Sequence, residues 1–268
     1  MTSLRQQTSS PKRLCDVRLT IIGSSGSFPG PAGPASCYLV EADGFRLLLD
    51  LGNGALSTLQ RHVDMYTIDA VYLSHLHADH CLDLCPYWVA RTYHPDGPRP
   101  RIPVYGPTGV ADRMAQAYGL DPHPGMRETF DFRELSPGTF RIGPFTATVD
   151  HVNHPIEAFG IRLEHNGAVL TYSGDTGACS ELVELARDAD LFLCEASFHD
   201  HREHPKDMHL TGSEAGEQAT RANARRLLLT HLVPWNDNEC TLAEARSTYN
   251  GPISLAVSGE VYEITAGG

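Results

Sequence analysis

Short apolar runs recur along the chain, and glycine, proline and polar residues separate them. Runs of this kind, bounded by turn residues, indicate buried β-strands. They predict strands over residues 18–22, 37–41, 45–50, 70–74, 102–105, 159–163, 169–172, 191–195 and 227–231, and two or three more between 128 and 149. Two pairs, 37–41 with 45–50 and 159–163 with 169–172, are close enough in sequence to form hairpins.

Stretches between the strands predict helices over residues 55–61, 82–93 and 109–118. A further helix is expected just after His209, because Thr211 and Glu214 have the spacing of a capping box. Strands alternate with helices, and each half of the chain contains a hairpin. This order favours two mixed sheets packed face to face, with helices outside them.

Several of the predicted strands end in a polar side chain that could bind a metal. The residues at these ends are His75, His154, Asp175, Glu195 and His231. Strand ends at one edge of packed sheets converge in space, and a rigid scaffold builds functional sites in this way. We therefore expect these side chains to meet.

The stretch from Ser74 to His80 is the densest group of candidate ligands. It contains His75, His77, Asp79 and His80 directly after an apolar strand. Alternate residues of an extended segment share a face, so the first two histidines can point the same way. A turn can then bring the aspartate and the last histidine to a second point nearby. Burying four such side chains is costly unless something pairs with them, and imidazole and carboxylate suit zinc, manganese or iron.

Three features have two interpretations each. His151 and His154 follow the same predicted strand, and either could be a ligand. Asp50 ends an apolar strand, where an aspartate either forms a turn or orients a metal ligand. Cys81 and Cys85 follow the histidines, but their apolar neighbours favour small residues on a buried helix face over a thiolate site.

Composition narrows the class of protein. The chain has 268 residues, 41% hydrophobic and 20% charged, which is ordinary for a globular protein. No apolar run approaches the roughly 20 residues of a membrane helix, and the seven scattered cysteines do not suggest a disulfide framework. We expect a disordered leader over residues 1–16, without the apolar core of a secretory signal, and one domain over residues 17–268, located in the cytoplasm.

The net charge is −12 with histidine neutral. An acidic surface argues against extended binding to a phosphate backbone, which needs clustered lysine and arginine. It does not argue against a small anionic substrate, because bound metals would supply positive charge.

Five motifs, in this order, resemble those of the metallo-β-lactamase superfamily over nearly the whole chain from Arg18 onward. They are Asp50, the run His75-x-His77-x-Asp79-His80, His154, Asp175 and His231. The resemblance implies an α/β (α+β) fold, a four-layer αββα sandwich of two mixed β-sheets, with the metals at one edge. It also gives Asp50 the role of orienting a ligand.

The resemblance implies two divalent metal ions. Zn²⁺ is the expected ion, with Mn²⁺ or Fe²⁺ as alternatives. The family pattern favours His154 over His151, because the family ligand commonly precedes proline. Carried over by position, the first metal would have His75, His77 and His154, the second would have Asp79, His80 and His231, and Asp175 would bridge them.

Two further segments resemble the phosphodiesterase branch that includes ribonuclease Z. They are Glu195-Ala-Ser-Phe198 and His209-Leu-Thr211. In this interpretation Glu195 holds His209 in its charged form beside a helix N-terminus, which suits a phosphate. His209 would neutralise charge or protonate the leaving oxygen, and Asp79 would orient or deprotonate the attacking water. The alternative is that His209 is an ordinary loop residue.

One departure from ribonuclease Z bears on the substrate. Enzymes of that type carry a long tRNA-binding arm between the third and fourth motifs, whereas only 20 residues separate His154 from Asp175 here. This spacing disfavours tRNA. Residues 73–83 and 229–235 resemble a group of actinobacterial proteins described as atypical cyclic-nucleotide phosphodiesterases.

The resemblance therefore implies hydrolysis of a small anionic phosphodiester, with 3′,5′-cAMP as the expected substrate. The alternatives are a ribonuclease Z-like tRNA endonuclease, a hydrolase of the thioesterase or lactonase type, and a metal-binding regulator without turnover. The resemblance also makes a homodimer plausible, and no membrane partner is expected.

Overall fold

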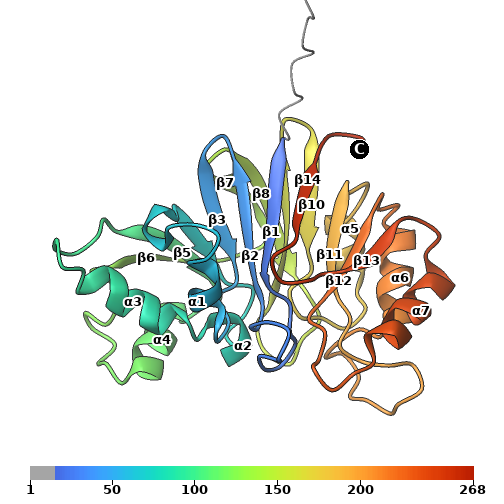
Figure 1. The fold of residues 1–268 in the computed structure, drawn as a ribbon, viewed down its shortest axis with the longest axis horizontal. Coiled ribbons are helices and arrows are strands. Elements are labelled where there is room, and N and C mark those ends of the chain that lie inside the picture. The colour runs from blue at the N-terminus through green and yellow to red at the C-terminus, as the bar shows by residue number, and fades with distance from the viewer. Residues whose placement is uncertain (1–15) are drawn as a thin grey trace, which may run out of the picture.

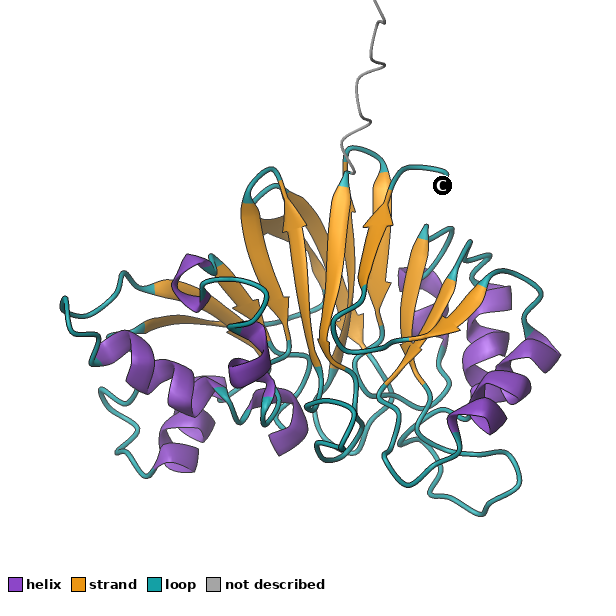
Figure 2. Cartoon of the chain, in the orientation of Figure 1, coloured by secondary structure: helices purple, strands orange, loops and turns teal. Residues whose placement is uncertain are grey.

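The computed structural model describes residues 16–268, so the predicted leader lies outside the described residues except for Asp16. Two seven-stranded β-sheets pack face to face at its centre (Figure 1, Figure 2). The first sheet contains β1 (Val17–Gly23), β2 (Cys37–Ala42), β3 (Phe45–Leu49), β4 (Ala70–Tyr72), β5 (Ile102–Gly106), β6 (Phe130–Glu134) and β14 (Val261–Ile264). The second contains β7 (Gly138–Ile142), β8 (Phe145–His151), β9 (Phe159–His165), β10 (Ala168–Tyr172), β11 (Leu191–Glu195), β12 (Leu227–Thr230) and β13 (Ile253–Leu255).

Three apolar clusters define four layers. One fills the space between the sheets. The second lies between the first sheet and the helices α1 (Ala55–Leu59), α3 (Leu84–Thr92) and α4 (Val110–Tyr118). The third lies between the second sheet and α5 (Ser180–Leu185), α6 (Gly212–Arg221) and α7 (Asn238–Thr248). The predicted αββα sandwich is therefore confirmed, with the helices on the two outer faces (Figure 1).

Parallel pairing explains why the candidate residues meet. In the first sheet β3, β4 and β5 run parallel, and in the second β10, β11 and β12 do. The carboxyl ends of parallel strands lie at one edge of a sheet, which is where open α/β sheets place their ligands. In Figure 1 this edge is the lower one, near the short helix α2 (Ala78–Cys81). The residues that follow these strands lie there.

Most predicted elements are present. The helix expected over residues 82–93 is α3, which begins at Leu84 and ends at Thr92. Asp83 precedes it; its N–H donates to the carbonyl oxygen of Leu51, and its carboxylate accepts from the N–H of Leu56 at 2.8 Å. These bonds tie the start of α3 to the loop after β3 and to α1. Six elements were not predicted: α2, α5, α7, β13, β14 and the short 3-10 helix η1 (Met65–Thr67).

The remaining composition-based expectations concern membranes and cysteines. Among the described residues, no helix has both the length and the apolar character needed to cross a bilayer. The six described cysteines are free thiols. Cys81 and Cys85 are buried in the core beside α3, which confirms their packing role.

Candidate metal centre

A first group of four side chains converges from three loops. His75 and His77 lie between β4 and α2, His154 lies between β8 and β9, and Asp175 follows β10. One potential ligand atom of each lies within 4.8 Å of those of the others. The sequence thus predicted correctly that these distant residues meet.

Hydrogen bonds outside this group fix which nitrogen each histidine offers to it. His154 Nδ1–H donates to the carbonyl oxygen of Met208 at 2.9 Å, which leaves its Nε2 with the lone pair. His75 Nδ1 lies 3.1 Å from Ser74 Oγ, whose own proton is donated to a neighbouring carboxylate at 2.8 Å. Both Nε2 atoms lie close to His77 Nδ1, at 3.1 Å for His75 and 3.2 Å for His154. His77 can give a proton to only one of them, so lone pairs converge on a point that suits a cation.

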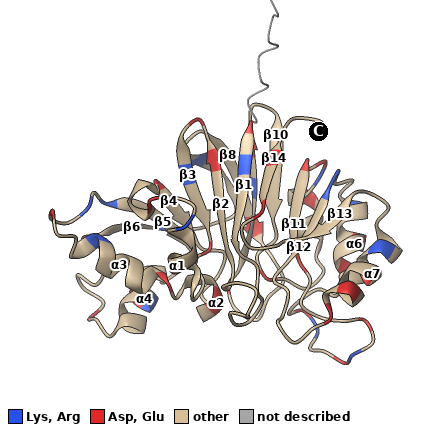
Figure 3. Cartoon of the chain, in the orientation of Figure 1, with Lys and Arg blue, Asp and Glu red and all other residues tan. Residues whose placement is uncertain are grey.

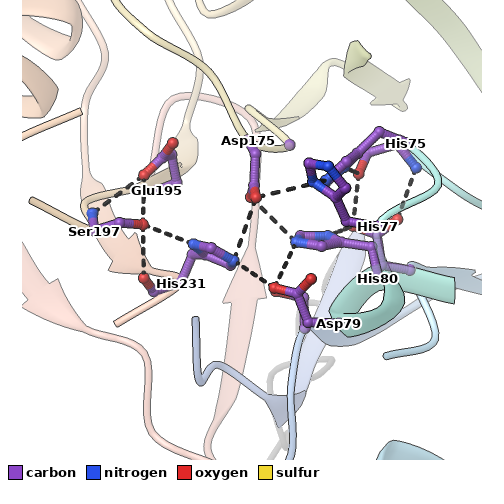
Figure 4. Close-up of polar contacts among 12 residues, drawn as sticks. His75, His77, Asp79, His80, Asp175, Glu195, Ser197 and His231 are labelled. Atoms are coloured by element: carbon purple, nitrogen blue, oxygen red, sulfur yellow. Dashed lines mark hydrogen bonds and ion pairs between the residues drawn. The ribbon is translucent and has the colours of Figure 1, made fainter. Parts of the chain in front are cut away.

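A second group contains Asp79, His80, His231 and, again, Asp175 (Figure 4). His231 Nε2 lies 3.0 Å from Asp79 Oδ2 and 3.3 Å from Asp175 Oδ2. His80 Nε2 lies 3.2 Å from Asp175 Oδ1. Asp175 belongs to both groups, so its carboxylate lies between them.

The second group also contains unsatisfied buried atoms. His80 Nε2 and Asp175 Oδ1 are buried and have no hydrogen-bond partner, although they face each other. Buried polar atoms without partners are rare in proteins, because desolvation is then uncompensated. Imidazole nitrogens and carboxylate oxygens are ligands for divalent metals of the zinc, manganese and iron type. The residues present therefore fit a pair of divalent ions.

The charge states of the histidines in the first group and of the two aspartates suit metal binding. Burial lowers the pKa of all three histidines in the first group, which favours the neutral imidazole that ligates metals. Burial raises the pKa of Asp79 and of Asp175, but the imidazoles of His231 and His80 outweigh it. They hold both pKa values well below the usual range of a carboxyl group. Both aspartates are therefore charged at neutral pH.

Asp50 orients the second group through a hydrogen bond to His80. Its buried Oδ2 accepts from His80 Nδ1–H at 2.7 Å, which directs His80 Nε2 at the cluster. The same carboxylate also accepts from the N–H and hydroxyl of Ser74 and from the hydroxyl of Tyr172. Of the two interpretations left open, the geometry thus favours the orienting role. Hydrogen bonds of this kind fix the tautomer and position of metal-binding histidines.

Backbone strain is concentrated at the ends of two strands beside the site. Asp50 follows β3 with φ of 58°, and His231 follows β12 with φ of 52°. Residues other than glycine rarely adopt this left-handed backbone conformation, and strain of this kind is typical of functional sites. A close approach adds a further constraint: a Cβ atom at Gly52 would lie 1.9 Å from the carbonyl oxygen of Asp79. Only glycine allows α2 to pack this close to the loop after β3.

A third group extends the site toward α6. His209 Nδ1–H donates to Glu195 Oε1 at 2.8 Å, and the His209 ring stacks on that of His231 with centroids 5.3 Å apart. Burial lowers the pKa of His209, but the carboxylate of Glu195 outweighs it and the pKa rises to about 9. The predicted capping box of Thr211 and Glu214 is present and begins α6 shortly after His209. His209 is thus a protonated imidazole beside the candidate ligands.

The competing residue His151 lies apart from these groups. It ends β8, its side chain is exposed, and its ring stacks on Phe159. Sequence reasoning missed the supporting residues: Ser74, Tyr172, Met208 and Ser197, whose hydroxyl bonds His231 Nδ1 at 2.7 Å (Figure 4). Ser74 and Ser197 had a signal, their places in the stretch from Ser74 to His80 and in the Glu195–Phe198 segment. The others act through backbone atoms or across the sheets.

Comparison with known proteins decides the family. Residues 46–232 match the family described as the beta-lactamase superfamily domain. The chain belongs to the metallo-β-lactamase superfamily. This superfamily member is 44% identical to the uncharacterized protein Rv1339 of Mycobacterium tuberculosis over 94% of each chain. It is also 29% identical to ribonuclease Z of Myxococcus xanthus, over 92% of this chain and 98% of the ribonuclease.

A solved structure supports the same placement. The probable metallo-hydrolase YhfI of Bacillus subtilis is 30% identical over 92% of this chain and 100% of its own. The crystal structure of YhfI superposes with a TM-score of 0.81 and 28% identity, covering 92% of this chain and 98% of that one. The protein is therefore a metal-dependent hydrolase of the ribonuclease Z-like, phosphodiesterase branch of the superfamily.

Proposed function

We propose that the protein is a dinuclear-metal phosphodiesterase that hydrolyses a 3′,5′-cyclic nucleotide, with cAMP as the substrate. The observation that carries the proposal is the position of His209. A protonated imidazole, fixed by Glu195, stands at the edge of two groups of candidate ligands that share Asp175. A cation beside a metal pair suits the hydrolysis of a phosphodiester. Water attacks the phosphorus, and the site must stabilise the negative charge on the departing oxygen.

Each group of side chains described above would hold one of the two metals. We assign one ion to His75, His77 and His154, the other to Asp79, His80 and His231, with Asp175 between them. Zn²⁺ is the proposed ion because imidazole is the main donor. Two such ions, when bound, lower the pKa of a water and neutralise phosphate charge.

The protein's own residues would then position the attacking water and protonate the leaving oxygen. Asp79 Oδ2 faces His231 Nε2 at 3.0 Å, so we assign these two atoms to the second ion and the other oxygen, Oδ1, to orienting the attacking water and accepting its proton. His209 donates a proton to the leaving 3′ oxygen, or neutralises the charge that develops there. Glu195 holds the His209 ring through Nδ1, and so leaves Nε2 as the nitrogen that faces the substrate.

A cavity next to His209 fits the remainder of a small nucleotide. It has a volume of about 270 Å³, and Phe198, His204 and Trp235 contribute to its lining. The Phe198 ring stacks on His204 and meets the His209 ring edge-on at 5.1 Å, while 68% of Trp235 is exposed. Aromatic faces stack on nucleobases with about 1–3 kcal/mol per base. The small volume favours one nucleotide over a polynucleotide.

A tRNA endonuclease is the second candidate, favoured by the similarity to ribonuclease Z. Three observations count against it. The residues between His154 and Asp175 form the hairpin of β9 and β10, with Asn166 and Gly167 at its turn. The alignment with ribonuclease Z spans 305 positions, more than the 268 residues of this chain, so the ribonuclease has segments without a counterpart here. Basic residues are also dispersed and interspersed with acidic ones (Figure 3).

The test is turnover by zinc- or manganese-loaded protein on three substrates: 3′,5′-cAMP, a pre-tRNA and bis(p-nitrophenyl) phosphate. Chelator-treated protein and Asp175→Asn serve as negative controls. We expect hydrolysis of cAMP, slower hydrolysis of the generic diester and no cleavage of the pre-tRNA.

Other outcomes contradict the proposal in distinguishable ways. Cleavage of the pre-tRNA without cAMP would establish the endonuclease and refute the inference from the missing insertion. Activity on the generic diester alone would contradict the cyclic nucleotide but not the phosphodiesterase. If none of the three is cleaved, an aryl ester is assayed in addition, and its hydrolysis would favour the thioesterase or lactonase type.

A further inference from the structure

A second set of metal-binding side chains lies outside the site described above. His199 and His201 belong to the loop between β11 and α6, while Cys240 and Glu244 are four residues apart on α7 and so share one helix face. One nitrogen of each histidine, the sulfur and a carboxylate oxygen all lie within 4.8 Å of one another. Figure 1 shows the loop after β11 next to α7.

His199 points to a ligand that is not a protein group. Its side chain is 2% exposed, and its Nε2 lies 3.1 Å from Thr241 Oγ1. The Thr241 hydroxyl donates to the carbonyl oxygen of Asp237, so it accepts from His199 Nε2–H. His199 Nδ1 therefore carries the lone pair, and it is buried without any partner. A histidine whose outer nitrogen is held by a hydroxyl and whose inner nitrogen is free has the arrangement of a metal ligand.

Glu244 supplies negative charge at the same place. Its Oε1 accepts from the N–H of Asp200 at 3.0 Å and from the thiol of Cys240 at 3.5 Å, and lies 3.9 Å from His201 Nδ1. The other oxygen, Oε2, is buried without a partner. A buried carboxylate that is only half satisfied is costly unless a cation is near.

We propose a third metal site, for Zn²⁺, formed by two histidines, a cysteine and a glutamate: His199, His201, Cys240 and Glu244. Four protein ligands of this kind are typical of closed structural zinc sites, and a thiolate disfavours magnesium, calcium and manganese. Tetrahedral zinc would place the ligand atoms about 3.3–3.7 Å apart. The His201 side chain, which is 59% exposed, is free to close the remaining distance.

A metal at this site would fix the position of the loop from His199 to His209 relative to α7. The segment from His199 to His209 carries the proposed acid at one end and the new ligands at the other. It also lines the cavity beside His209, together with Phe198. A metal that bridges this loop and α7 would hold the cavity wall and His209 in place without touching the substrate. The site is thus distinct from the catalytic metals and does not depend on the proposed substrate.

Replacing the metal with Co²⁺ tests the site, because a cysteine ligand gives bound Co²⁺ a characteristic absorption band. The groups around Asp175 contain no cysteine, so a thiolate-to-Co²⁺ charge-transfer band in the near ultraviolet can come only from a cysteine site elsewhere. The protein is stripped with a chelator, loaded with Co²⁺ and measured as wild type, Cys240→Ser, His201→Ala and Cys179→Ser. Cys179 is the matched control, because it is also partly exposed but lies outside the cluster.

We expect the band in the wild type and in Cys179→Ser. It should disappear in Cys240→Ser and shift or disappear in His201→Ala, whose exposed position leaves folding intact. Zinc content should fall from three equivalents to two in Cys240→Ser. A band that is absent from the wild type, or unchanged in either cluster variant, would overturn the proposal.

Discussion

Asp50→Asn tests how the scaffold holds the metal centre. The buried carboxylate accepts four hydrogen bonds: at Oδ1 from Ser74 N–H at 2.7 Å, and at Oδ2 from Ser74 Oγ–H at 2.8 Å, His80 Nδ1–H at 2.7 Å and Tyr172 O–H at 2.7 Å. Asparagine has the same shape and tolerates the left-handed backbone at this position. The substitution therefore removes only the charge and one of the two acceptor atoms.

The expected loss follows from these contacts. If the amide nitrogen takes the place of Oδ1, it faces the N–H of Ser74; if it takes the place of Oδ2, it faces three donors. At least one buried donor loses its acceptor, which costs about 1–3 kcal/mol. We expect the free energy of unfolding of the metal-free protein to fall by about that amount. Zinc affinity should fall about 10–100-fold, because His80 loses its orienting carboxylate.

The assay compares Asp50→Asn with Asp43→Asn. Asp43 also has a positive φ, of 49°, but 70% of its side chain is exposed. Its substitution should change stability by less than about 0.5 kcal/mol. Urea unfolding of the metal-free proteins gives the first quantity, and competition with a chromophoric chelator gives the zinc affinity. Equal results for the two variants would refute the role of Asp50.

Three further predictions concern the catalytic residues. His209→Ala should lower kcat by about 10²–10⁴-fold with metal content unchanged; a wild-type kcat would exclude it as the acid. Glu195→Gln removes the carboxylate that, against burial, raises the pKa of His209 to about 9. Activity is lost as pH rises through that pKa, so the alkaline limb of kcat should move to lower pH; an unmoved limb would assign it to another group. After dialysis, His154→Ala should lose metal and His151→Ala should keep it, and equal metal contents would contradict the ligand assignment.

Much of this architecture follows from local sequence patterns. Apolar runs bounded by turn residues located the parallel strands whose carboxyl ends carry the candidate ligands. A polar residue shortly after each of these runs reaches the two groups around Asp175. Asp175 and His231 could be predicted in this way because strand ends converge whenever the strands share a sheet, whereas the choice of His154 over His151 came from the family resemblance. The capping box at Thr211 was predictable because its two hydrogen bonds join residues three apart.

Contacts made by side chains that are not at the predicted strand ends could not be predicted. The Tyr172 hydroxyl reaches Asp50 across the two sheets, and no spacing in the sequence records this pairing. Cys240 and Glu244 meet His199 only because α7 packs beside the loop after β11. The helix itself escaped prediction because few of its side chains are buried, so its sequence lacks a marked apolar face.

The most direct test of the central claim is product analysis of 3′,5′-cAMP hydrolysis while the metal-free protein is titrated with Zn²⁺ or Mn²⁺. We predict no turnover without metal, activity that rises as the two groups around Asp175 fill, and 5′-AMP as the product, because His209 is assigned to the leaving 3′ oxygen. No hydrolysis at any metal loading, or a 3′-AMP product, would contradict the account.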